Sequence, residues 1–426
     1  MQTVLVTDPA FPCAHLTLHF AAGPAFDPPE RQGLTALTHR ALIRGTRKRS
    51  REALEEAVEI LGAELVTATR NHAVSLGGPV LTRHLDAYID LVGETLCEPL
   101  LAEDEIEKVK RELLAEFEAA CDEDGALARI WFQRVMYPGH PFGQGASGSK
   151  ATLAAITPAD VAAHAARVYT RHNLIVGASG DVTDDHLAAR LDHALAPLQG
   201  GAPLDWSFPP VPQTKGRRVT LVDRPGRNQA QILVGHPSIA AADPDFIALH
   251  IALTALGGTF SSRLMQVIRV ERGWSYGAYA RVAAERAGGT FMMTAAPSTE
   301  NAVDTLGLLF SEYSRFVDGS LDDDEIEFAR DHLARAFPFT IETAGLQVTQ
   351  RVRALLLGRP ADHVDRWLDL LAAPTPDQIR DAVRRRLTPD DLTAVMVGSW
   401  DAPLRAGVDA LPGVVAVDVV PAGALP

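Results

Sequence analysis

The sequence predicts an α+β protein made of two homologous domains, each a mainly antiparallel β-sheet packed against α-helices. Three observations support this fold class: segments that repeat at a nearly constant offset, strand and helix patterns that alternate within each half, and a segment rich in glycine and proline between the halves. A length of 426 residues suits two domains of ordinary size.

The repeat consists of three pairs of similar segments that occur in the same order in both halves. Their offsets are 321 − 101 = 220, 375 − 157 = 218 and 393 − 173 = 220. The same order and a nearly constant offset indicate two copies of one domain of about 200 residues. The pairs are LAEDEIE at 101–107 with LDDDEIE at 321–327, TPAD at 157–160 with TPDQ at 375–378, and NLIVG at 173–177 with TAVMVG at 393–398.

Each half is expected to run strand, helix, strand pair, long helices, helix and strand. The first half opens with the strand pattern AHLTLHF at 14–20, continues with a helix within 33–46, and ends on the apolar run at 173–177. Helices packed against one sheet follow from this order. Glycine and proline interrupt all periodicity at 201–214, so the predicted domains are residues 1–200 and 215–426, joined by that linker.

Composition excludes several classes of partner. The 40 basic and 54 acidic residues give a net charge of −14, so no basic surface favours nucleic acid or an anionic membrane. The sequence has no run of 18 apolar residues and no signal-peptide pattern, which predicts a cytoplasmic protein. Three cysteines without C-x-x-C spacing predict no disulfide framework.

The stretch GLTALTHRALIRGT at 33–46 has the frame of a zinc-peptidase helix. It resembles G-L-A-H-F-L-E-H-M-L-F-K-G-T of the M16 family (pitrilysin, insulin-degrading enzyme, mitochondrial processing peptidase), whose inverted zinc motif is H-x-x-E-H. In this alignment Ala36 replaces the first ligand histidine, His39 the general-base glutamate, and Arg40 the second ligand histidine. The resemblance places the third ligand, a glutamate on a later helix, at Glu116.

These replacements predict that the helix does not hold zinc. Positions i, i+3 and i+4 share one helix face, but zinc needs deprotonated nitrogen, oxygen or sulfur donors. Ala36 offers no donor, and the guanidinium of Arg40 keeps its positive charge. A rearranged metal site around His39 and Glu116 has too few ligands, so we expect Glu116 to pair with Arg40 or His39 instead.

A second motif lies in the C-terminal half, where LGGTFSSRLMQVIRVERGWSY spans 256–276. It is similar to the M16 signature L-G-G-G-x-S-S-R-L-x-x-x-I-R-E-x-x-G-L-A-Y, in which an arginine and a tyrosine seven residues later face the zinc site. The resemblance assigns these roles to Arg269 and Tyr276. Arg263 and Arg272 are nearby competitors, but only Arg269 has the spacing of seven to the tyrosine.

Two further features are interpreted less narrowly. Gly257 and Gly258 are expected to allow a tight turn or a close backbone approach between the halves. The strand at 61–69 matches the edge strand to which catalytic relatives add a bound peptide. Without zinc beside it, this edge either still binds peptide or is idle, and the sequence leaves both open.

The leading hypothesis is that the chain is the non-zinc-binding subunit of a heterodimeric M16 peptidase. A homologous H-x-x-E-H subunit would hold the zinc, and this chain, inactive alone and without a cofactor, would contribute Arg269 and Tyr276 to peptide binding and transition-state stabilisation. The alternative is a catalytically inactive scaffold or peptide-binding module. A homodimer of the isolated chain stays possible under either hypothesis.

Overall fold

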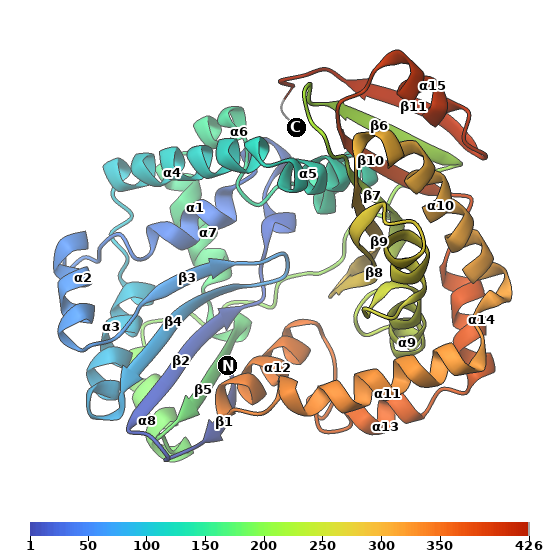
Figure 1. The fold of residues 1–426 in the computed structure, drawn as a ribbon. Helices are drawn as coiled ribbons and strands as arrows, with labels where there is room; N and C mark the ends of the chain where they lie inside the picture. The colour runs from blue at the N-terminus through green and yellow to red at the C-terminus, as the bar shows by residue number, and fades with distance from the viewer. Residues whose placement is uncertain (425–426) are drawn as a thin grey trace. The chain divides into compact units, whose positions relative to one another are not determined.

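The computed structural model describes residues 1–424, which form two compact units, each an α+β structure with one sheet (Figure 1). Unit 1 contains Met1–Glu118, Gln144–Ser207 and Pro338–Val364. Unit 2 contains Ala119–Gly143, Phe208–Phe337 and the chain from Asp365 onward. The predicted fold class is confirmed.

The sheet of unit 1 has five strands in the order β1-β5-β2-β4-β3. β1 and β5 pair in parallel, and the other neighbours pair antiparallel. β3 therefore forms one edge of the sheet, but it is shorter than the strand predicted at 61–69, because only Val66–Thr69 is strand. The strands are β1 (Gln2–Thr7), β2 (Cys13–Phe20), β3 (Val66–Thr69), β4 (Val74–Leu81) and β5 (Leu174–Gly180).

Helices cover both faces of this sheet. Apolar residues of α3 and α8 share a core with Leu16, Leu18 and Val176, whereas Val348 and Val352 of α12 pack with Ile175 on the opposite face. β5 is buried along almost its whole length, as expected for a strand between two helical layers. The helices of unit 1 are α1 (Leu34–Ala41), α2 (Arg51–Ile60), α3 (Leu85–Cys97), α6 (Lys150–Ala155), α7 (Pro158–Val168), α8 (Asp184–Ala194) and α12 (Ala344–Leu356).

The sheet of unit 2 has six strands in the order β11-β6-β10-β7-β9-β8. β6 pairs in parallel with β10 and β11, and the remaining neighbours are antiparallel. β8 forms an edge, in the place that β3 has in unit 1. The strands are β6 (Arg217–Asp223), β7 (Gln231–Ser238), β8 (Ser275–Glu285), β9 (Gly288–Pro297), β10 (Leu392–Gly398) and β11 (Val414–Val420).

The main core of unit 2 lies between this sheet and several helices, with Phe291, Phe310 and Tyr313 among its large side chains. α5 packs separately against β7 and β10, and every residue of β10 is buried. The helices are α5 (Asp124–Met136), α9 (Phe246–Gly257), α10 (Ala302–Arg315), α13 (Trp367–Ala372), α14 (Pro376–Arg386) and α15 (Ala402–Asp409).

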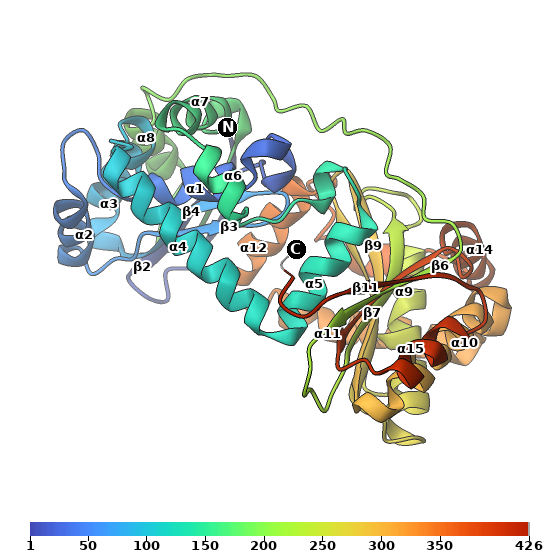
Figure 2. The same ribbon diagram turned by 90° about the horizontal axis from the view of Figure 1, so that it is seen from above.

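The two units exchange one equivalent helix along the chain. α5 and α12 begin at an offset of 344 − 124 = 220, the offset of the sequence repeat. α5 follows the segments of unit 1 but packs in unit 2, and α12 follows the segments of unit 2 but packs on β1 and β5 (Figures 1 and 2). The chain passes between units within α4 (Glu103–Asp122) and α11 (Asp323–Thr340).

The predicted domain boundaries, 1–200 and 215–426, describe the repeated halves of the sequence and stay a prediction. What the compact units add is that each half places one helix in the other unit. The predicted linker at 201–214 has neither helix nor strand (Figure 2). Within residues 1–424, no helix is long and apolar enough to cross a membrane, and the predicted cytoplasmic location stays a prediction.

Candidate functional site

The helix with the zinc-peptidase frame is α1, and a buried carboxylate fixes its first turn. Asp27 accepts hydrogen bonds from the backbone N–H of Gly33 and of Thr35, each at 3.0 Å, and from the Thr35 hydroxyl. These bonds satisfy amide groups that have no partner inside the helix. Burial raises the pKa of Asp27 to about 7, and the bonds from Thr35 and Gly33 oppose that shift. The residues aligned with zinc ligands therefore lie on an ordered helix.

His39 is an internal structural residue of unit 1. Its Nε2 lies 2.7 Å from the Ser75 carbonyl oxygen and its Nδ1 lies 2.9 Å from the Tyr169 hydroxyl. Because a carbonyl only accepts, Nε2–H donates to Ser75 and Nδ1 accepts from Tyr169. Burial lowers the pKa of His39 to about 4. Both ring nitrogens are thus used, and neither offers a free lone pair to a metal.

Arg40 and Glu116 form an ion pair with two hydrogen bonds. The sequence predicted that Glu116 would pair with either Arg40 or His39, and it pairs with Arg40. The guanidinium nitrogens of Arg40 donate to both carboxylate oxygens of Glu116, at 2.6 and 2.7 Å. The hydrogen bond from Arg40 holds the pKa of Glu116 below its usual range. One helical turn along, Arg44 pairs with Glu112 at 2.5 Å. The positions aligned with the second and third ligands do meet, but through opposite charges.

These residues do not fit a zinc ion. Ala36 has no donor and is buried in a core cluster with Leu37 and Leu113. Arg40 occupies both oxygens of Glu116, and His39 has no unused nitrogen. The part of the chain that the structure describes contains no group of three histidine, cysteine, aspartate or glutamate side chains that could hold a metal. The helix α1 and Glu116 therefore do not hold a catalytic zinc ion.

The second predicted group, Arg269 and Tyr276, comes together in unit 2. Arg269 lies in a π-helix, Met265–Val270, and Tyr276 lies at the start of β8. The guanidinium carbon of Arg269 is 4.6 Å from the centre of the Tyr276 ring. Tyr276 is 85% exposed, so its ring and hydroxyl face solvent. π-helical turns are frequent at functional sites.

Two hydrogen bonds donated by backbone N–H groups hold the π-helix and the start of β8 together. The Ala278 N–H donates to the sulfur of Met265 at 3.3 Å, and the Trp274 N–H donates to the Ile268 carbonyl at 3.1 Å. The pairing of β8 with β9 also shifts register between Ser275 and Ala278. Such an irregularity re-aims side chains. Tyr276 consequently points outward while Ser275 and Ala278 are buried.

The structure separates Arg269 from the two competing arginines. Arg263 donates to the Glu325 carboxylate and to the Ser320 carbonyl, and Arg272 donates to the Val267 carbonyl at 2.9 Å. Among residues 1–424, the Arg269 side chain has no hydrogen-bond or ion-pair partner, and its guanidinium contacts only aromatic rings. Its five N–H donors are therefore available to a ligand.

Phe260 is a member of this group that the sequence did not reveal. Its ring centre lies 4.3 Å from the guanidinium carbon of Arg269, on the side of the loop that follows α9. The only sequence signal is one aromatic residue among Gly257, Gly258, Thr259 and serines. A single aromatic residue in a loop is not part of a helix or strand periodicity, so its contact with Arg269 cannot be predicted from the sequence pattern.

Gly257 is required for a close approach within unit 2. A Cβ atom at Gly257 would lie 2.7 Å from the Cβ of Ala280 on β8. The glycine thus lets the end of α9 lie directly against β8, the strand that carries Tyr276. This contact joins two elements of one unit, and the tight turn or close approach between the halves that the sequence suggested for Gly257 and Gly258 stays a prediction.

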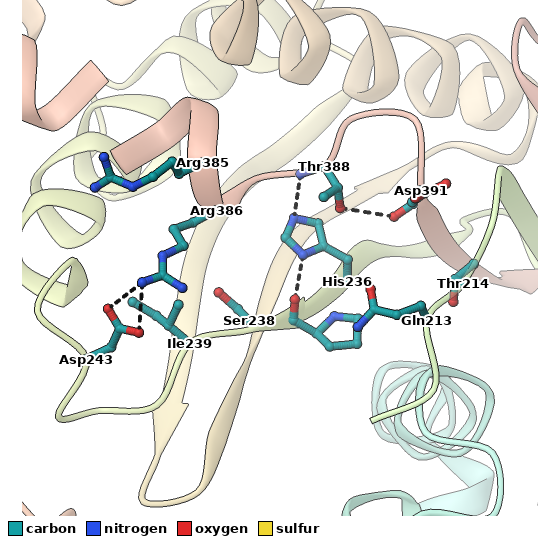
Figure 3. A pocket seen from close by; sticks show the side chains of 11 residues that line it. Gln213, Thr214, His236, Ser238, Ile239, Asp243, Arg385, Arg386, Thr388 and Asp391 are labelled. Carbon is teal, nitrogen blue, oxygen red and sulfur yellow. Dashed lines mark hydrogen bonds and ion pairs between the residues drawn. The ribbon is translucent and has the colours of Figure 1, made fainter. Parts of the chain in front are cut away.

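A separate cavity of about 320 Å³ in unit 2 carries no free acid, base or ligand set (Figure 3). Arg386 pairs there with Asp243 at 3.2 Å. The His236 ring lies 2.7 Å from the Pro237 carbonyl oxygen and 2.6 Å from the Tyr313 hydroxyl. These groups already have partners, which makes the cavity a weaker candidate than the surface around Arg269.

Two repeated α+β units and a zinc-peptidase helix without metal donors define the class of this protein: a metallopeptidase-like chain that cannot bind the catalytic ion through that helix. Residues 2–144 match the family profile described as insulinase (peptidase family M16), and residues 155–333 match the one described as peptidase M16 inactive domain. The chain belongs to the M16 family.

Individual relatives agree with this assignment. An uncharacterized zinc protease of Streptomyces coelicolor is 26% identical over 390 residues, covering 90% of this chain and 84% of that protein. The non-peptidase homolog YmxG of Helicobacter pylori is 23% identical over 393 residues, covering 91% and 89%. A crystal structure of a peptidase M16 inactive domain from Pseudomonas fluorescens has a TM-score of 0.86 at 24% identity and covers 94% and 96% of the two chains.

Proposed function

We propose that this chain is the non-zinc-binding subunit of a two-chain M16 peptidase, and that Arg269 and Tyr276 act on a peptide held at the zinc site of a homologous partner. The observation that carries the proposal is a contrast between two sites. Arg40 donates to both carboxylate oxygens of Glu116, whereas the guanidinium of Arg269 contacts aromatic rings but has no hydrogen-bond or ion-pair partner in the described chain. One site is closed to a ligand and the other is open.

The chemistry of Arg269 and Tyr276 suits a peptide carbonyl. In peptide hydrolysis negative charge develops on the carbonyl oxygen, and donors that are already oriented towards it stabilise the transition state. Arg269 supplies a fixed charge with several N–H donors, and Tyr276 supplies an O–H donor. Neither group activates water, so the water-activating zinc has to come from the partner.

The test is reconstitution with a homologue that keeps H-x-x-E-H, followed by zinc analysis and a peptide-cleavage assay. The complex should cleave, and Arg269→Ala should lower kcat/KM by about 10²- to 10³-fold, the range for loss of one oxyanion donor. Tyr276→Phe, which removes only the hydroxyl, should also lower it. Arg272→Ala is the matched control, because Arg272 is bonded to its own segment. It should leave kcat/KM nearly unchanged.

Two results would contradict the proposal. One is stoichiometric zinc together with proteolysis by the purified single chain. The other is an Arg269→Ala complex that cleaves as well as the Arg272→Ala complex. Size-exclusion chromatography with light scattering should accompany both assays, because the isolated chain can also form a homodimer through the surface meant for the partner.

The second candidate is a scaffold or peptide-binding module without a catalytic contribution. The relative named as a non-peptidase homolog favours it, since that relative covers nearly the whole chain. A scaffold has no use for an unpaired guanidinium beside an exposed tyrosine. Normal assembly with the partner, combined with cleavage that is insensitive to Arg269→Ala, would favour the scaffold.

A further inference from the structure

The orientation of the Arg269 guanidinium is not set by hydrogen bonds. Arg263 is fixed by Glu325 and Ser320, and Arg272 by the Val267 carbonyl. Arg269 has no such bond within the described residues. A long side chain of this kind has many rotamers, and a catalytic donor has to occupy one of them before the substrate arrives. Something other than a polar partner must therefore restrict it.

Two aromatic rings contact the guanidinium of Arg269. Its central carbon lies 4.3 Å from the ring centre of Phe260 and 4.6 Å from that of Tyr276. The negative face of an aromatic ring attracts a cation at such distances. This attraction restrains the group and leaves its N–H donors unused, because a phenyl ring is not a conventional hydrogen-bond acceptor.

Phe260 makes this contact from an ordered surface loop. The Ser262 hydroxyl donates to the Thr259 carbonyl at 2.6 Å, which orders the loop around Phe260. Thr259 and Ser262 are buried, but Phe260 is 63% exposed. A phenylalanine that leaves most of its surface in water adds little to a core. Its ring is best accounted for by Arg269.

We propose that Phe260 is a positioning residue, which holds the guanidinium of Arg269 in place with its N–H donors free for the peptide carbonyl. This inference rests on the proposed function for its catalytic consequence, but the positioning itself belongs to the single chain. Phe260 then acts only through Arg269, whereas Tyr276 both contacts the guanidinium and carries its own donor.

Positioning is tested without the partner by the NMR signal of the Arg269 side-chain Nε–H, assigned by its loss in Arg269→Lys. Ring currents from Phe260 should displace this signal from the ordinary arginine position. Phe260→Ala should move it towards that position, and Phe260→Tyr should restore the displacement. Phe328→Ala is the control, since Phe328 is also an exposed phenylalanine of unit 2. A signal that does not move in Phe260→Ala would overturn the proposal.

The catalytic consequence is tested in the reconstituted complex with a double-mutant cycle. Phe260→Ala should lower kcat/KM by about two- to fivefold, as expected for loss of an exposed cation–π contact. In an Arg269→Ala background the same change should have no further effect. A full additional loss there, or wild-type kinetics for Phe260→Leu, would show that the ring does not act on the guanidinium. No effect of Arg269→Ala itself would instead contradict the proposed function.

Discussion

Arg40 shows how one side chain can close a metal site without contributing much stability. The side chains of Arg40 and Glu116 are 32% and 54% exposed. Ion pairs this close to solvent contribute on the order of 0–1 kcal/mol, because water screens them and two long side chains lose freedom. The importance of the pair is chemical: a guanidinium that never loses its proton occupies both oxygens of the remaining candidate ligand.

Buried histidines should make the stability of the chain depend on pH. Burial lowers the pKa of His39 and of His236 to about 4, from 6.5. The unfolded chain binds protons at these rings below about pH 6.5, and the folded chain does so only near pH 4. The contribution of these two histidines to the free energy of unfolding should therefore be fully present above pH 6.5. It should decrease as the pH falls towards 4. Asp27, whose pKa is raised to about 7, has the opposite sign and loses its contribution as the pH rises through 7.

The measurement is urea unfolding at several pH values between 4.5 and 6.5. His236→Gln should reduce the slope of unfolding free energy against pH by about 1.4 kcal/mol per pH unit, the value for one titrating group. His332, an exposed histidine on α11, gives the control His332→Gln, which should leave the slope unchanged. Equal slopes in the two variants would contradict the assignment of a neutral, buried His236.

At the scale of elements, the candidate site depends on how α9, the π-helix and β8 meet. The π-helix presents Arg269, and the register shift at the start of β8 turns Tyr276 outward. Neither feature has a sequence signature that predicts it. Arg269 and Tyr276 are seven residues apart in the sequence, and they are in contact because of the π-helix and the register shift at the start of β8.

Gly257→Ala should disrupt the same junction. The new Cβ would lie 2.7 Å from the Cβ of Ala280, so α9 or β8 would have to move. Overpacking of this kind costs about 1–3 kcal/mol of unfolding free energy, which urea unfolding would measure. Gly345→Ala on α12 is the control, since its Cβ would approach only Ser179 Oγ and Thr343 Oγ1, at 3.8 Å or more. If Gly257→Ala lowered the free energy of unfolding no more than Gly345→Ala, α9 and β8 would not be closely packed at this position.

For the whole molecule, the exchange of α5 and α12 makes each unit depend on both halves of the chain. Unit 1 includes Pro338–Val364, and unit 2 includes Ala119–Gly143. Val348, Val352 and Leu356 of α12 cover apolar surface of the first sheet, which would otherwise meet water. A fragment of residues 1–200 therefore lacks a layer of its own core, and so does a fragment of 215–426.

Separate expression of these two fragments should give poorly folded chains, whereas co-expression should restore both units. Circular dichroism and a thermal transition of each fragment, alone and mixed, would measure this. The uncut chain is the reference, because the cut falls in a linker without helix or strand. Cooperative unfolding of either fragment alone, with the stability of the intact chain, would mean that the exchanged helix is dispensable.

Local patterns predicted much of this structure. The offset of 220 indicated two equivalent units, and the sheets indeed place β3 and β8 at corresponding edges. The loss of donors at Ala36 and Arg40 could also be predicted, because donor chemistry depends on residue type alone. The position of α5 against β7 and β10 could not be predicted, since the apolar pattern of a helix does not specify which sheet it covers.

The sequence by itself determined the repeated α+β fold, the loss of the zinc ligands and the retention of Arg269 and Tyr276. Periodicity, turn residues and side-chain chemistry are local properties that a chain carries wherever it folds. Only the tertiary structure decided that Glu116 binds Arg40 rather than His39, that α12 covers the first sheet, and that Phe260 lies against Arg269. The physical reason is that these contacts join residues whose distance along the chain says nothing about their distance in space, so only the packing of whole elements selects them.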